Sequence, residues 1–127
     1  MKFFLFSQLL LLPLFIVHAD WLSFRGSQGN GNSDFNTPGK LNVQSERSWK
    51  VELPGRGLSS PILVKGSIFL TASSGPQQEN LHILAYDSRS GEKKWERVFK
   101  ATGRTICHSK TSVAAATLAS DGNFLIA

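Results

Sequence analysis

The stretch Leu81–Val98, LHILAYDSRSGEKKWERV, decides how the rest of the chain is interpreted. Over its first six positions the side chains alternate with the period of two that is typical of a β-strand. Asp87 and Gly91 then predict a chain reversal, because an Asp carboxylate can accept hydrogen bonds from nearby backbone N–H groups and Gly adopts a positive φ at little cost. Trp95 follows on the expected return strand. We therefore predict a hairpin whose large indole must pack against a neighbour.

Four residues of this stretch, Ala85, Asp87, Gly91 and Trp95, are spaced as Ala-x-Asp-x-x-x-Gly-x-x-x-Trp. The run resembles the repeat of the quinoprotein-type, or PQQ-like, eight-bladed β-propellers, whose blades carry Ala-x-Asp-x-x-Thr-Gly-x-x-x-Trp. Ser90 stands at the usual Thr position, so one hydroxyl residue replaces another. In that family the Trp packs against the next blade, and the small Ala leaves room for its ring. The alternative interpretation is an ordinary hairpin with a core Trp.

Residues 1–19 have the pattern of a secretory signal peptide. Lys2 provides a short basic start, residues 3–17 are mostly apolar, and Val17-His18-Ala19 is a small-residue cleavage pattern before Asp20. The apolar run is short for a membrane-spanning helix, which needs roughly 20 residues. An uncleaved anchor is the alternative. We expect an exported protein, periplasmic or extracellular, with no membrane span once the signal is removed.

The amino-acid composition and charge exclude few classes of protein. The chain is 41% hydrophobic and 18% charged, which is ordinary for a globular domain. Lys2 is the only charge in the first 19 residues, so the remainder carries 13 basic and 9 acidic residues. The basic residues are scattered and form no strip that could follow a phosphate backbone, so no nucleic-acid partner is expected. The sole cysteine, Cys107, cannot form an internal disulfide.

Residues 20–45 are expected to be an N-terminal loop segment, because Gly, Asn and Ser dominate them. Their glycines do not follow the dinucleotide-binding order, and no strand pattern precedes them. The cluster Trp21-x-x-Phe24-Arg25-Gly26-x-x-Gly29-Asn30-Gly31 looks like the opening of exported propeller proteins with quinoprotein-like repeats. The resemblance implies that Trp21 and Phe24 anchor this segment to the propeller body.

The remainder, residues 46–127, is expected to be an incomplete PQQ-like β-propeller repeat domain. Residues 46–53 predict a lone outer strand carrying Trp49, which precedes Trp95 by 46 residues, about one blade. Residues 59–64 and 68–71 flank a Lys65-Gly66-Ser67 turn and predict a second hairpin. With the strands expected over 81–86 and 92–98, this makes four antiparallel strands, or one blade.

The C-terminal part repeats this pattern weakly. Residues 60–68 align without a gap on residues 116–124, at an offset of 56, although Gly66 with Gly122 is the only identity. The next blade is therefore expected to begin near Ser112. The expected fold class is all-β: a partial β-propeller of about one complete four-stranded blade, a lone strand and the start of the next blade. Propellers close with roughly four to eight blades, so we expect the N-terminal piece of a longer protein.

Candidate chemistry is sparse. Cys107-His108 could act as a nucleophile or bind a metal, but adjacent residues on an extended chain point to opposite sides. Arg104 stands where a haem-attachment motif needs its first cysteine. His82 lies mid-strand without an acidic neighbour in the sequence, which favours a structural role. No catalytic, cofactor-binding or metal-binding residue is assigned; the residues singled out are those of the repeat motif, Ala85, Asp87, Gly91, Trp95 and Trp49.

Two functions are compatible with the resemblance. The first is a fragment of an exported, non-catalytic propeller that acts as a scaffold for a protein partner in the cell envelope, as non-enzymatic relatives with these blades do. The alternative is the N-terminal part of a pyrroloquinoline-quinone-dependent dehydrogenase whose active site lies beyond residue 127. No residue present matches the quinone or calcium ligands that the family uses, and there is no adjacent cysteine pair. A shared fold does not by itself imply the enzymatic activity.

Overall fold

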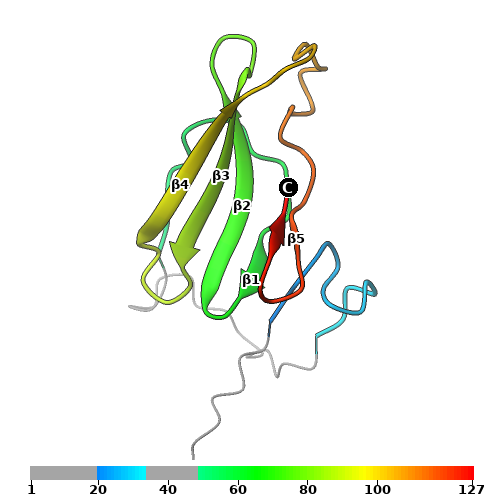
Figure 1. Ribbon diagram of the computed structural model, residues 1–127, viewed down its shortest axis with the longest axis vertical. Coiled ribbons are helices and arrows are strands. Elements are labelled where there is room, and N and C mark those ends of the chain that lie inside the picture. Colours follow the sequence, from blue (N-terminus) through cyan, green and yellow to red (C-terminus); the bar gives the residue numbers. More distant parts are fainter. Residues whose placement is uncertain (1–19, 34–48) are drawn as a thin grey trace, which may run out of the picture.

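The computed structural model describes residues 20–33 and 49–127, and the described residues are all-β with no helix. A four-stranded antiparallel sheet has the order β1-β2-β3-β4, and a two-stranded sheet pairs β5 with β6 (Figure 1). The bounds are β1 Ile62–Val64, β2 Ser67–Ser74, β3 Asn80–Asp87, β4 Lys93–Lys100, β5 Ala119–Ser120 and β6 Leu125–Ile126. The expected all-β class and the four antiparallel strands are confirmed. The signal-peptide prediction lies outside the described residues.

Tight turns connect β1 to β2 and β3 to β4. Val64 pairs with Ser67 across Lys65 and Gly66, which both have positive φ, 47° and 73°. Positive φ at both central residues is typical of the two-residue hairpin turn whose twist matches that of the flanking strands. The second turn, after Asp87, is longer, and the register shifts between Ala85 and Tyr86 opposite β4. This shift inserts one extra residue into β4, as in a β-bulge.

The lone strand expected over residues 46–53 is not observed. Residues 46–48 lie outside the described residues, and residues 49–53 form no strand. Their contacts come from side chains instead, because Val51 and Leu53 pack against the sheet. The backbone pairing next to β2 is made further along, where Arg56 and Ser73 exchange two hydrogen bonds of 2.8 Å. The Pro54-Gly55 pair separates these two types of contact and breaks the extended run.

Each face of the four-stranded sheet is covered by a different part of the sequence. One face, here called the rear face, packs Ala72, Leu84 and Tyr86 against Val51 and Leu53, which precede the sheet. The opposite face, the front face, packs residues of β1, β2 and β3 against Leu118 and Leu125, which follow it. Leu22 of the N-terminal segment also packs on the front face, so the layers follow the order of the sequence only from Val51 onward.

The N-terminal segment joins the two sheets. Trp21 and Leu63 exchange backbone hydrogen bonds of 2.7 and 3.0 Å, so residue 21 pairs alongside β1 as one antiparallel bridge. The next carbonyl, of Leu22, accepts a bond of 2.9 Å from the Ser120 N–H in β5. The Trp21 ring also lies over Gly26, where a Cβ would come within 2.9 Å of it. The expected loop over residues 20–33 is therefore tied to the sheets at its start. The remainder of the expected loop, 34–45, lies outside the described residues.

Candidate docking surface

The hairpin turn between β3 and β4 is held by the Asp87 carboxylate. Its Oδ1 accepts hydrogen bonds from the backbone N–H groups of Arg89 (2.9 Å) and Ser90 (3.1 Å) and from the Ser90 hydroxyl (3.3 Å). Its Oδ2 lies 3.2 Å from Lys94 Nζ. The bonds from the Ser90 and Arg89 N–H groups, then Lys94, lower the pKa of Asp87 to about 2. The chain reversal predicted from Asp87 and Gly91 is confirmed, with Gly91 at a φ of 73°.

Trp49 packs on this turn. Its Nε1 donates to the Ser88 carbonyl at 3.2 Å. A Cβ placed on Gly91 would lie 2.5 Å from Cδ2 of the Trp49 ring, so only glycine allows the indole to approach this closely. Gly91 is buried under the ring, whereas Trp49 itself is 38% exposed. Gly91 therefore serves two needs at once, the positive φ and the space for the indole.

Trp95, 46 residues further along, lies on the front face. It is the Cα partner of Ala85, which is paired in turn with Phe69, so the three side chains form one row across the sheet. The Phe69 and Trp95 ring centroids are 5.7 Å apart and the rings are tilted by 49°. Ala85 is fully buried between them. Trp95 remains 39% exposed, because its outer side has no covering residue within the described part of the chain.

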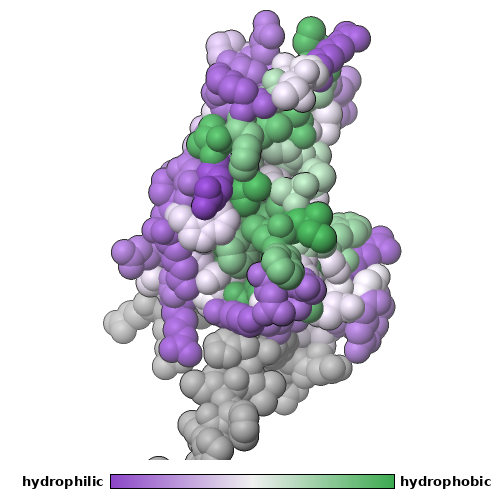
Figure 2. All heavy atoms as spheres, viewed as in Figure 1, coloured by the Kyte–Doolittle hydropathy of each residue, from purple (hydrophilic) through white to green (hydrophobic). Residues whose placement is uncertain are grey.

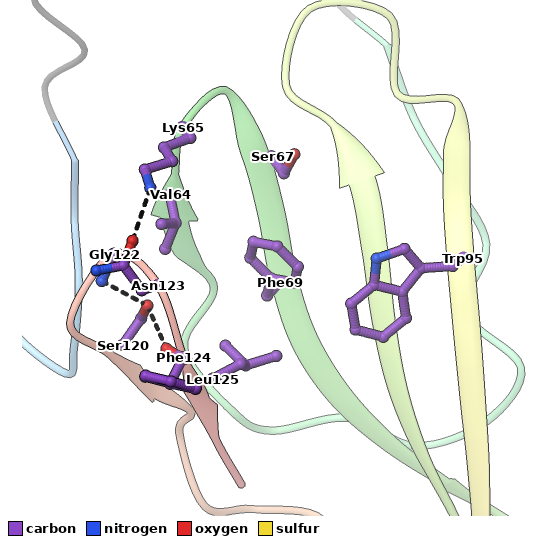
Figure 3. Close-up of a pocket in the computed structure, with 10 residues that line it drawn as sticks. All are labelled: Val64, Lys65, Ser67, Phe69, Trp95, Ser120, Gly122, Asn123, Phe124 and Leu125. Atoms are coloured by element: carbon purple, nitrogen blue, oxygen red, sulfur yellow. Dashed lines mark hydrogen bonds between the residues drawn. The ribbon is translucent and has the colours of Figure 1, made fainter.

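A cavity of about 280 Å³ lies between this row and the β5–β6 hairpin (Figure 3). Figure 3 shows Phe69 and Trp95 on the sheet side and Phe124 and Leu125 on the hairpin side. The Lys65 ammonium donates to Asn123 Oδ1 at 3.2 Å and joins the two turns. Phe124 is 74% exposed, so apolar surface continues beyond the cavity.

A second cavity of about 370 Å³ continues the apolar surface along the front face. The residues around it are mostly apolar: Thr71, Leu81, His82, Ile83, Phe99, Val113, Ala114, Ala116 and Ala127. Figure 2 shows hydrophobic side chains gathered along the middle of the visible face, with hydrophilic residues at its margins. A contiguous apolar patch bordered by polar residues is typical of a protein interaction surface.

The sequence analysis missed one polar cluster. Ser74 Oγ lies 2.7 Å from His82 Nε2, and His82 Nδ1 lies 2.8 Å from Glu96 Oε1. The interpretation of His82 as a residue without an acidic neighbour is therefore wrong, because the pairing of β3 with β4 brings Glu96 to it. Knowing that Leu84 is opposite Glu96 would have revealed this contact. The bonds from Lys93, then His82, lower the pKa of Glu96.

This Ser–His–Glu order matches that of hydrolytic triads, but its surroundings favour a structural role. The Gly55 backbone lies directly on Ser74, since a Cβ on Gly55 would come within 2.9 Å of Ser74 Cβ. The Gly55 backbone therefore fills the space next to the Ser74 hydroxyl, where the carbonyl group of a substrate would have to lie. His82 is 7% exposed, so the two hydrogen bonds satisfy both of its ring nitrogens within the sheet.

Cys107 and His108 do not act on one another. Cys107 Sγ accepts a bond from Gln78 Nε2 at 3.3 Å, whereas His108 Nδ1 accepts from the Lys110 N–H at 3.1 Å. Within residues 20–33 and 49–127 there is no group of three or more His, Cys, Asp or Glu side chains placed to hold a metal ion. The same part of the chain contains no helix with the length and apolarity needed to cross a membrane.

Comparisons of the chain with protein-family models, with curated proteins and with solved structures found no match. The functional interpretation therefore depends on the geometry of the described residues and on the sequence pattern.

Proposed function

We propose that this chain contributes one blade and the start of the next to an exported β-propeller with quinoprotein-like repeats. In this proposal the propeller is a non-catalytic scaffold that binds a protein partner in the periplasmic or extracellular space. The observation that carries the proposal is the placement of two tryptophan side chains, Trp49 and Trp95. Trp49 packs on the turn between β3 and β4, and Trp95 follows that turn on β4, where its ring remains partly exposed on the front face.

The layering of the chain supports the same interpretation. Val51 and Leu53, which directly precede the sheet, cover its rear face, and Leu118 and Leu125, which follow it, cover its front face together with Leu22 of the N-terminal segment. Successive blades of a propeller are stacked in this way, each burying one face against the preceding blade and one against the next. A two-layer sandwich, in contrast, buries only one face of each sheet.

The β5–β6 hairpin supports a second blade. It lies at the position expected from the offset of 56 residues, and Gly122 has a φ of 92° where Gly66 has 73°. The turns differ in length, because two residues separate Val64 from Ser67 whereas four separate Ser120 from Leu125. The longer turn is held by Asp121 Oδ1, which accepts 2.8 Å bonds from the N–H groups of Asn123 and Phe124.

A quinone-dependent dehydrogenase is less well supported. A calcium-bound quinone needs several oxygen donors, carboxylates above all, converging on one site. The described residues offer no such group, and the cavity beside Trp95 is lined mainly by apolar side chains with Lys65 as its only charged residue. The residues present therefore do not fit the cofactor.

Two experiments test the proposal. The first is N-terminal sequencing of the protein recovered from the producing cell. The sequence is expected to begin at Asp20, in an exported fraction; an intact start at Met1 in the cytoplasm would overturn the export part of the proposal.

In the second experiment, pyrroloquinoline quinone and Ca²⁺ are added to the protein. Absorbance titration is expected to show no binding, and a dye-reduction assay with alcohols is expected to show no turnover. Quinone-dependent dye reduction would favour the enzyme.

A further inference from the structure

The outer strand β4 has one free edge. It is the last strand in the sheet order, and Figure 1 shows it at the margin of the sheet. None of the described residues pairs with its outer side. The start of β4 is irregular because of the bulge near Lys94, and a bulge of this kind hinders pairing with a further strand. From Trp95 to Lys100 the register is regular, so this part of the edge can accept a strand.

The direction of the backbone amides along this edge follows from the hydrogen bonds at the end of the β3–β4 pair. The Ala101 N–H donates to the Glu79 carbonyl at 2.9 Å, so residue 101 directs its amide toward β3. Successive residues of a strand alternate in this direction. Trp95, Arg97 and Phe99 therefore face β3. The outward amide groups belong to Glu96, Val98 and Lys100.

Apolar side chains lie on both faces of this edge. Val98 is 55% exposed on the rear face and Phe99 is 51% exposed on the front face. Consecutive strand residues point to opposite faces, so a ligand that binds one face alone would leave either Val98 or Phe99 exposed to water. A strand added alongside β4 continues both faces and can cover both side chains.

The charge of the strand indicates the chemistry of its partner. Lys93 is paired with Glu96 at 2.7 Å, and Lys94 lies 3.2 Å from Asp87. Of the two remaining cations, Arg97 forms no ion pair within the described residues, and Lys100 interacts with the Glu79 carboxylate without forming a close ion pair. Pairing between the β4 edges of two copies would bring the excess positive charge of each strand together, and like charges across strands are destabilising. A partner with acidic side chains avoids this repulsion.

We propose that the outer edge of β4, from Glu96 to Lys100, binds an extended acidic segment of a partner protein by strand addition. Backbone hydrogen bonds to Glu96, Val98 and Lys100 supply the pairing, acidic side chains meet Arg97 and Lys100, and apolar side chains cover Val98 and Phe99. This deepens the proposed scaffold function and depends on it. The quinone assay tests that function separately, so a failure of either one can be recognised.

The order of side chains in β4 defines a probe peptide. Arg-Val-Phe-Lys, residues 97–100, is complementary to Glu-Val-Val-Glu in either strand direction, because that tetrapeptide is symmetric. A terminally blocked Thr-Glu-Val-Val-Glu-Thr peptide is titrated into the full chain while amide chemical shifts and hydrogen exchange are recorded by NMR. We expect protection to rise at the outward amides of Glu96, Val98 and Lys100, with little change at Arg97 and Phe99, which are already bonded to β3.

Two controls separate strand addition from simple charge attraction. The same peptide with N-methyl groups on three alternate residues keeps its charge but cannot pair, and it is expected to lose binding. In the double variant Arg97→Glu, Lys100→Glu, affinity for the acidic peptide is expected to fall about tenfold, and a Thr-Lys-Val-Val-Lys-Thr peptide is expected to bind instead. Absence of binding, equal binding of the N-methylated peptide, or protection of Glu96 and Val98 that rises with protein concentration alone would overturn the proposal.

Discussion

The indole of Trp49 lies against the backbone of Gly91, so closely that a methyl group there would sit 2.5 Å from the ring. The two residues are 42 positions apart in the sequence, and the contact joins the segment before the sheet to the turn between its last two strands. It gives a physical reason for glycine at position 91. The ring needs a surface without a side chain, and the turn needs a residue that tolerates positive φ.

The first prediction concerns this contact. Gly91→Ala is expected to destabilise the protein by about 1–3 kcal/mol, because it combines a strained φ with displacement of the ring. Trp49→Ala is expected to cost about 2 kcal/mol, less than a fully buried aromatic residue, because the ring is 38% exposed. The double variant is expected to lose about 1 kcal/mol less than the sum of the two, as measured by urea unfolding.

Gly29→Ala is the matched control. Gly29 also has a positive φ, 68°, but nothing lies within 4 Å of the position of a Cβ. It therefore reports the cost of the backbone strain alone. If Gly91→Ala costs no more than Gly29→Ala, the ring does not press on residue 91 and the contact is not energetically important.

The hairpin and the sheet could be predicted from sequence because their signals are local. Alternation over residues 81–86, an Asp that bonds to the next backbone amides, and a Gly with positive φ are properties of a few neighbouring residues. The position of Trp49 on Gly91 was not predicted, because it depends on how a non-strand segment crosses the sheet. The Ser74–His82–Glu96 cluster was missed for a related reason: three strands must pair in one register before these side chains meet.

The second prediction concerns acid sensitivity. Asp87 has a pKa of about 2 in the folded chain against an ordinary value of 3.8, so its bonds stabilise the folded state above pH 3.8. As the pH falls from about 4 through about 2, the carboxylate takes up a proton and this contribution is lost. The urea midpoint is therefore expected to fall over that range. Asp87→Asn should flatten the fall; an unchanged acid profile in this variant would mean that another carboxylate determines it.

The third prediction concerns the polar cluster on the rear face. Ser74→Ala leaves Nε2 of the buried His82 without its partner, which is expected to cost about 1–3 kcal/mol. Ser27→Ala is the control, because its exposed hydroxyl makes one 3.2 Å bond to the Asp20 carbonyl and should cost less than about 0.5 kcal/mol. Equal midpoints of urea unfolding for the two variants would show that the cluster does not connect the strands. Esterase activity that is lost in Ser74→Ala would contradict the structural interpretation.

The most direct test of the account is the solvent exposure of Trp95 in the protein as its own cell produces it. In the proposed propeller a further β-sheet covers this ring, which is 39% exposed within the described part of the chain. Hydroxyl-radical oxidation, followed by mass spectrometry of the peptide that contains residue 95, measures this exposure. We predict that Trp95 is oxidised at least several-fold more slowly in the native protein than in the full 127-residue chain expressed alone. Equal rates in the two preparations would contradict the propeller.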